Sequence, residues 1–324
     1  MRENMSSFEK KISDLRARIN NELLPLIDNR PCAYMDLPYH PNIGDILIWE
    51  GTEQFLKDNQ LKCLFRNSEY TYFHREVPRR AVILLHGGGN FGDIWREHQN
   101  LRLRVIEEYP DHPIIILPQT VFYTDKALMK QDAEAMKSHP NLTICARDEV
   151  SYTILQANFP THRILLLPDM AFCISAEKLH KLSASVIPDN RSLLVMRTDK
   201  ELAAIDIDKL HLNKDSVDVR DWPSMERRPR YMRLFTKLNY YCHRAGTFAI
   251  PLADRYVLQC VRPRLLRTGV RFLQSYTTIY TTRLHVAILA TLLHRHFTLL
   301  DNNYGKNSSF YRTWLKDLPN VGTI

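Results

Sequence analysis

Short apolar runs alternate with helical patterns along the chain, and this alternation predicts an α/β protein. Residues 7–24 have apolar side chains at helical spacing and predict a first helix. Five later runs are apolar throughout and are bounded by turn residues, which is typical of strands buried on both faces of a parallel sheet. They are CAYMDL (32–37), AVILL (81–85), PIIILPQ (113–119), LTICAR (142–147) and RILLLPD (163–169). Helical patterns lie between these runs, so we expect the βαβ order of a doubly wound sheet.

A second set of elements follows a polar, Ser-rich stretch at about residues 175–192. It contains the apolar runs SLLVMR, SVDVRDW, TTIYTT and FTLLDN and the apolar helix LHVAILATLLHR. A chain of 324 residues has room for two such sets, because single cores stop growing at roughly 250 to 300 residues. We therefore predict two Rossmann-like α/β lobes, one from residues 1–175 and one from residues 176–324.

The composition, with 44% hydrophobic and 25% charged residues, is typical of a globular protein. The N-terminal segment is too charged for a secretory signal, and the longest clean apolar run, VAILATLL, is too short to cross a bilayer. We therefore expect a cytoplasmic protein. The six cysteines have neither zinc-module spacing nor a disulfide pattern, so we expect reduced thiols.

The net charge of +8 is concentrated in one segment, because residues 220–271 contain twelve Lys and Arg but three acidic residues. This segment has a helical pattern. Single-strand-binding modules instead combine positive charge with aromatic stacking platforms on strands, so we expect no nucleic acid partner. An anionic substrate or the anionic face of a membrane fits better. The alternative is a solvated helix face with no ligand.

Four of the ten glycines lie in HGGGNFGDIW (86–95), directly after the run AVILL. We expect a strand, a glycine-rich turn and the start of a helix there, with Gly88, Gly89 and Asn90 as candidate binding residues for an anion. A tight turn without a ligand is the alternative. The motif is neither GxGxxG nor a P-loop, and the chain has no GxSxG elbow. Dinucleotide, nucleoside triphosphate and serine hydrolase chemistry are therefore not indicated.

A second loop, PYHPNIGD, repeats the pattern of Asn, one residue, Gly and Asp. The Asn and the Asp of the pattern are Asn42 and Asp45 in this loop, and Asn90 and Asp93 in the glycine-rich loop. Because the carboxyl ends of parallel strands meet at one edge of a sheet, we expect both carboxylates on the same rim. Helix capping is the alternative role for both aspartates.

Two candidate binding arginines follow strands. Arg147 ends a strand in ARDEVSY, where an ion pair with a neighbouring acidic residue is the alternative. Arg197 ends the first strand of the second lobe in VMRTD, and a charged residue at that point would face a cleft between the lobes.

Further candidates lie near the C-terminus. Arg283 and His285 begin the apolar helix of TTRLHVAILATLL, and this combination at a helix N-terminus makes an anion site with a titratable donor. A core role is the alternative for His285. The loop DNNYGKN adds Asn303 and Lys306 as candidate binding residues, with a surface turn as the alternative.

Taken together, these motifs resemble the polysaccharide pyruvyl transferases, most closely the bacterial exopolysaccharide-operon type. The motifs NIGD, HGGGNFGD, LPQT, ARDEVSY, LLPDMAF, VMRTD, TTRLHVAIL and DNNYGKN occur in the family order between about residues 34 and 314. The resemblance implies a fold similar to GT-B glycosyltransferases. It also implies transfer of a pyruvate ketal from phosphoenolpyruvate to two hydroxyls of a sugar, with release of phosphate and without a cofactor.

The resemblance also implies roles for residues. It maps a second-lobe arginine onto Arg197, an Arg-Leu-His motif onto Arg283, Leu284 and His285, and a glycine-loop acid onto Asp93. The first lobe would then bind the acceptor and the second lobe phosphoenolpyruvate, whose phosphate and carboxylate suit guanidinium groups. Our hypothesis is that His285 protonates the methylene carbon while Asp93 takes the proton of the attacking hydroxyl. Since guanidinium groups neutralise the phosphate, we expect no metal.

The expected acceptor is a sugar linked to polyprenyl diphosphate at the inner face of the cytoplasmic membrane, as the resemblance implies. The basic segment 220–271 would contact the diphosphate or that membrane face. Two alternatives stay open. One is a glycosyltransferase of the same fold that uses a nucleotide sugar, and the other is a non-catalytic scaffold that binds sugars or membranes.

Overall fold

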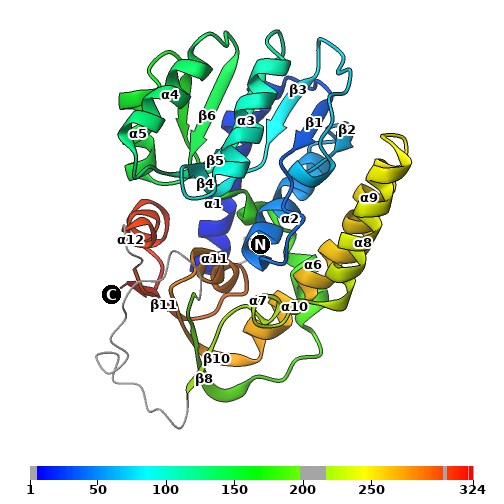
Figure 1. Cartoon of the computed structure of the whole chain (residues 1–324). Coiled ribbons are helices and arrows are strands. Elements are labelled where there is room, and N and C mark those ends of the chain that lie inside the picture. Colours follow the sequence, from blue (N-terminus) through cyan, green and yellow to red (C-terminus); the bar gives the residue numbers. More distant parts are fainter. Residues whose placement is uncertain (1–5, 198–216, 302–304, 320, 324) are drawn as a thin grey trace.

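The computed structural model describes residues 6–197, 217–301, 305–319 and 321–323. Within these residues the chain forms two lobes, each built around a parallel sheet (Figure 1). The predicted α/β class with two Rossmann-like lobes is confirmed. The predicted boundary at residues 175 and 176 falls between the last strand of the first sheet, which ends at Leu166, and the first strand of the second, which begins at Asp189.

The first sheet has the strand order β2-β1-β3-β5-β6-β7, and β4 pairs with β5. Its strands are β1 (Cys32–Met35), β2 (Cys63–Arg66), β3 (Val82–Leu85), β4 (Gly88–Gly92), β5 (Ile114–Phe122), β6 (Leu142–Ala146) and β7 (Arg163–Leu166). The helical elements of this lobe are α1 (Ser7–Ile27), α2 (Ile43–Asp58), η1 (Glu69–Thr71), α3 (Arg96–Glu108), α4 (Lys126–Lys137), α5 (Glu149–Asn158) and η2 (Met170–Cys173). The central strands are buried on both faces, which explains why they are apolar throughout.

The second sheet has the order β12-β11-β10-β8-β9. Its strands are β8 (Asp189–Val195), β9 (Val217–Arg220), β10 (Tyr276–Thr281), β11 (Phe297–Leu299) and β12 (Val321–Thr323). The helices described in this half of the chain are α6 (Ala176–Ser183), α7 (Pro223–Glu226), α8 (Arg230–Ala245), α9 (Ile250–Tyr256), α10 (Arg262–Gln274), α11 (Leu284–Leu292) and α12 (Lys306–Phe310), with π-helical turns at Val257–Val261 and Tyr311–Leu315. Helices α8 and α9 stand beside the first lobe (Figure 1). None of the described helices is long and apolar enough to cross a membrane.

The glycine-rich segment differs from its prediction, because Gly88–Gly92 forms strand β4 and the next helix begins only at Arg96. Strand β5 extends beyond β3, and β4 pairs with this extension. The pairing brings Gly92, at a φ of 136°, so close to β5 that a methyl group there would lie 1.7 Å from the carbonyl oxygen of Phe122. The expected helix N-terminus at the glycines is therefore wrong.

Helix α2 joins the two lobes. It packs against η2 of the first lobe and against α10 and α11 of the second, so one apolar core runs through both lobes. Two glycines allow these close approaches. A methyl group at Gly51 would lie 1.9 Å from the carbonyl oxygen of Met170, and one at Gly269 would lie 2.5 Å from Cγ2 of Ile43.

Gly51→Ala is expected to destabilise the fold by about 3 kcal/mol, because overpacking against a rigid backbone costs more than the roughly 1 kcal/mol that alanine gains in helix propensity. Denaturant unfolding measures this free energy. Gly322→Ala is the matched control, since a methyl group there meets its nearest heavy atom, Oγ1 of Thr298, at 3.9 Å. A Gly51→Ala protein as stable as this control would contradict the packing argument.

Candidate active site

A cleft of about 280 Å³ lies between the lobes. Its lining residues are His40, Pro41, Asn42, Asp45, Tyr70, Gly89, Asn90, Trp95, Glu97, His98 and Arg147 from the first lobe and Arg197, Trp222, Met225, Arg283, Leu284, His285 and Lys306 from the second. All but three of the candidate residues named from the sequence are among them. Gly88 and Asp93 are not in the lining, and Asn303 lies outside the described residues.

A cluster of Arg147, Asp169 and His285 connects the lobes at this cleft. Nη1 of Arg147 lies 2.8 Å from Oδ2 of Asp169, and the same oxygen lies 3.3 Å from Nε2 of His285. Burial disfavours the ionised carboxyl, but the hydrogen bond from His285 and the charges of His285 and Arg147 hold the pKa of Asp169 well below its usual range. Nε2 of His285 also lies 3.2 Å from Nη1 of Arg147, so this one ring nitrogen contacts both members of the Arg147–Asp169 ion pair.

The local folds of β7 and α2 set this geometry. Asp169 follows β7, and its other oxygen accepts a hydrogen bond of 2.9 Å from the N–H of Ala171 at the start of η2. His285 lies in the first turn of α11, with its ring against the first turn of α2. A methyl group at Gly44 would lie 2.6 Å from Nδ1 of His285, so glycine is needed for the imidazole to occupy this position.

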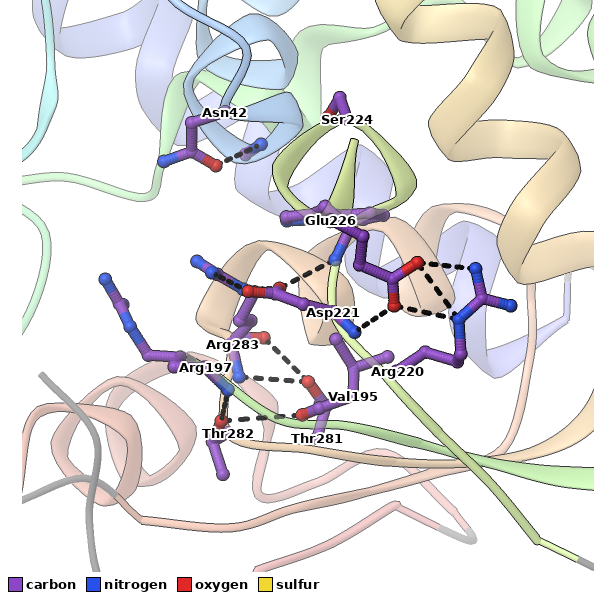
Figure 2. Close-up of polar contacts among 12 residues, drawn as sticks. Asn42, Val195, Arg197, Arg220, Asp221, Ser224, Glu226, Thr281, Thr282 and Arg283 are labelled. Carbon is purple, nitrogen blue, oxygen red and sulfur yellow. Dashed lines mark hydrogen bonds and ion pairs between the residues drawn. The ribbon is translucent and has the colours of Figure 1, made fainter. Parts of the chain in front are cut away.

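Arg283 is fixed by a buried ion pair with Asp221. Nε and Nη2 of Arg283 donate to the two carboxylate oxygens of Asp221, with 2.6 Å between Nη2 and Oδ2 (Figure 2). Both residues are 3% exposed. The backbone N–H of Asp221 donates to Glu226, which in turn pairs with Arg220. This bidentate pairing holds the Arg283 side chain at the cleft wall.

Arg197 and Lys306 bring two more cations to the cleft. The backbone N–H of Arg197 donates to Oγ1 of Thr282 at 3.1 Å, which fixes the end of β8 beside the start of α11 (Figure 2). A methyl group at Gly89 would lie 3.1 Å from Nη2 of Arg147 and 3.7 Å from Nζ of Lys306. The absence of a side chain at Gly89 therefore lets both cations approach the backbone of β4.

Asp45 lies in the first turn of α2, at the cleft. Asn42 caps this helix by accepting from the N–H of Gly44 at 3.0 Å, and its amide nitrogen donates to Asp45 at 2.7 Å. Nε2 of His40 lies 3.7 Å from the same carboxylate oxygen. Burial opposes ionisation, but the charges of His40, His285 and other nearby cations lower the pKa of Asp45.

Asp93 has a different position from the one expected. Its carboxylate accepts from the N–H and hydroxyl of Thr124, each at 2.6 Å, and from the N–H of Asp125 at 2.8 Å. It therefore stabilises the turn between β5 and α4 and does not line the cleft. Asp45 lines the cleft and Asp93 does not, because the pairing of β4 with β5 carries the chain past the cleft before Asp93.

The far end of the cleft is aromatic and was not predicted from the sequence. Tyr70 and Trp95 line it together with Glu97 and His98. Burial disfavours the charged form of His98, but the charge of Asp36 and a 2.8 Å hydrogen bond to it raise the pKa of His98 to about 9. The cleft lining thus combines cations with ring faces and hydrogen-bonding groups, and we call the part formed by Tyr70, Trp95, Glu97 and His98 the aromatic end.

Comparison with known proteins identifies the family. A model of the polysaccharide pyruvyl transferases matches residues 42–304. The chain belongs to this family. It is 33% identical to the putative pyruvyl transferase EpsO of Bacillus subtilis, over 99% of this chain and 96% of that protein. It is 28% identical to pyruvyl transferase 1 of Schizosaccharomyces pombe, over 87% of this chain and 69% of that protein.

A solved structure supports the fold. A functionally uncharacterised protein of Klebsiella pneumoniae superposes with a TM-score of 0.62 at 20% identity, over 96% of this chain and 98% of that one. Membership of the polysaccharide pyruvyl transferase family makes the protein an enzyme that transfers pyruvate to a polysaccharide. The resemblance found in the sequence is confirmed, and it favours this activity over a glycosyltransferase or a non-catalytic scaffold.

Proposed function

We propose that the enzyme transfers a pyruvate ketal from phosphoenolpyruvate to two hydroxyls of a sugar in a lipid-linked exopolysaccharide precursor, and that it releases phosphate. The observation that carries this proposal is that four cations, Arg147, Arg197, Arg283 and Lys306, line the same cleft as His285, with Nη1 of Arg147 3.2 Å from Nε2 of His285. Phosphoenolpyruvate has a phosphate and a carboxylate, and planar guanidinium groups bind both in bidentate fashion. Three of the four cations belong to the second lobe, the proposed donor side, and Arg147 belongs to the first.

His285 is the proton donor in this mechanism. It protonates the methylene carbon of phosphoenolpyruvate, the double bond supplies the electron pair, and the carbon that bears the phosphate becomes oxocarbenium-like. Asp169 holds the imidazole through Nε2. A positioned acid or base of this kind is worth about 10²- to 10⁴-fold in rate.

The two sugar hydroxyls complete the reaction. The first attacks the oxocarbenium-like carbon and gives its proton to a carboxylate, for which we propose Asp45 in place of Asp93, since Asp45 lines the cleft. Phosphate then leaves with the C–O bond electrons, and the second hydroxyl closes the ketal. Asp45 passes its proton to the departing phosphate, and the proton of the second hydroxyl restores His285.

The aromatic end of the cleft is the proposed acceptor side. Trp95 and Tyr70 offer ring faces to the apolar face of a sugar, and Glu97 offers an acceptor for its hydroxyls. Enzymes that act on lipid-linked sugars meet them at the membrane surface. We therefore propose that the enzyme acts in the cytoplasm, at the inner face of the cytoplasmic membrane.

Gly44→Ala tests the position of His285. We expect turnover to fall roughly 10- to 100-fold, because the new methyl group displaces the imidazole from Asp169 and small misplacements of catalytic groups are costly. Stability should change little, since the roughly 1 kcal/mol that alanine gains in helix propensity offsets the cost of displacing one side chain. Steady-state kinetics and thermal unfolding, with Gly322→Ala alongside, separate the two effects. Unchanged turnover would contradict the role of His285.

Ligand-dependent unfolding tests the donor. Phosphoenolpyruvate at about 100 times its dissociation constant should stabilise the protein by roughly 2.7 kcal/mol, and nucleotide sugars should not. Cations of the chain neutralise the phosphate in this proposal, so the stabilisation and the activity should persist in EDTA. Stabilisation by a nucleotide sugar alone would refute the proposal, and activity that needs an added divalent cation would refute metal independence.

A further inference from the structure

Helices α8 and α9 run side by side as a hairpin (Figure 1). This hairpin carries exposed aromatic and apolar side chains. Tyr240 and Tyr241 near the end of α8 are 57% and 66% exposed, Phe248 in the connection is 82% exposed, and Leu252 in α9 is 58% exposed. The opposite face of α8 buries Met232, Phe235 and Cys242 in the core. The outer face is thus an exposed surface on an anchored element, and we call it the hairpin face.

The hairpin face is strongly basic. The sequence has no Asp or Glu from residue 227 to residue 253, but it has six Lys and Arg there. Of these, Arg230, Arg233, Lys237 and Arg244 lie in α8 and are exposed. The acidic residue that follows, Asp254, is buried and accepts a hydrogen bond from Tyr39. Positive charge on this surface is therefore not balanced by acidic residues of the hairpin itself.

The hairpin contacts the aromatic end of the cleft. Nε2 of His243 lies 2.6 Å from the carbonyl oxygen of Tyr70, and the amide nitrogen of Asn239 lies 3.4 Å from it. Tyr70 lines the cleft. Anything bound to the hairpin face is consequently held next to the end of the cleft that we assign to the sugar acceptor.

We propose that the hairpin face docks on an anionic phospholipid bilayer. Tyrosine and phenylalanine prefer the interface between lipid and water, and Arg and Lys beside them are attracted to anionic headgroups. Docking by this face presents the aromatic end of the cleft to a sugar whose lipid anchor stays in the bilayer. This inference deepens the proposed function, because it rests on a lipid-linked acceptor.

Co-sedimentation of the full-length protein with vesicles tests the proposal. The protein should bind vesicles of phosphatidylcholine with phosphatidylglycerol, and bind vesicles of phosphatidylcholine alone much more weakly. The triple change Arg233→Gln, Lys237→Gln and Arg244→Gln should weaken binding about 100-fold, since each cation near an anionic surface contributes about fivefold. The double change Tyr241→Ser and Phe248→Ser should weaken it roughly tenfold or more.

The matched control is Ile187→Ser, because Ile187 is 91% exposed but lies before β8, outside the hairpin. It should leave vesicle binding unchanged, and all variants should keep the unfolding temperature of the parent. Failure to bind anionic vesicles, or an equal loss in the control, would overturn the proposal. Self-association that the hairpin changes abolish, without vesicle binding, would assign the face to a second copy instead.

Two further measurements keep this inference distinct from the proposed function. Stabilisation by phosphoenolpyruvate, and turnover of a short water-soluble sugar acceptor, should be unchanged in the hairpin variants, whereas turnover of a lipid-linked acceptor in vesicles should fall. Vesicle binding without any effect of phosphoenolpyruvate would refute the donor and leave the docking face in place. Stabilisation by phosphoenolpyruvate without vesicle binding would refute the docking face and leave the donor in place.

Discussion

His285→Ala is expected to lower turnover by about 10²- to 10⁴-fold while phosphoenolpyruvate still binds. The loss follows from the proposed proton transfer to the methylene carbon, for which Asp169, kept ionised by its lowered pKa, has no proton to give. Binding should survive because Arg147, Arg197, Arg283 and Lys306 remain at the cleft.

The measurement is a comparison of kcat with the phosphoenolpyruvate dissociation constant from titration calorimetry. Asp169→Asn is the companion variant. It keeps the size of the side chain but removes the charge that orients His285, so it should lower kcat to a smaller extent. If His285→Ala weakened phosphoenolpyruvate binding as much as turnover, the histidine would be a binding group and the assigned proton donor would be wrong.

The sequence carries most of the information about the two sheets. Strands such as β3 and β6 are buried on both faces, so their apolar runs stand out between polar turns. Strand β4 is different, because its five residues GGNFG have no strand pattern and form a strand only through pairing with the extension of β5. From the sequence alone, a glycine-rich segment after a strand predicts a turn. Here the segment forms a strand because it pairs with β5.

The candidate site is predicted where residues directly follow strands or begin helices. Arg147 and Arg197 follow strands, His285 lies in the first turn of a helix, and all three line the cleft. Asp169 also follows a strand, in the run RILLLPD, and the same rule applied to it would have added it to the site. The partnership of Arg283 with Asp221 and the aromatic end formed by Tyr70 and Trp95 depend on how distant loops meet, and no local pattern encodes that.

Arg283→Met is expected to destabilise the protein by about 3 to 5 kcal/mol and to remove the stabilisation by phosphoenolpyruvate. Arg283 and Asp221 are both buried, and removal of one partner of a buried ion pair leaves the other charge without compensation. Asp221→Asn alone should also destabilise, because it leaves the guanidinium without its carboxylate. The amide oxygen of the new asparagine can still accept a hydrogen bond from the N–H of Trp222, so the backbone conformation at residues 221 and 222 is preserved.

The double variant Arg283→Met with Asp221→Asn separates stability from binding. A buried pair replaced by uncharged groups costs little, so the double variant should recover most of the stability that each single change loses. It should still lack stabilisation by phosphoenolpyruvate, because the lost cation is not restored. Denaturant unfolding of all four proteins with and without phosphoenolpyruvate measures both quantities. Additive losses of stability would show that the two residues are not coupled, and a ligand response in the double variant would remove Arg283 from the donor site.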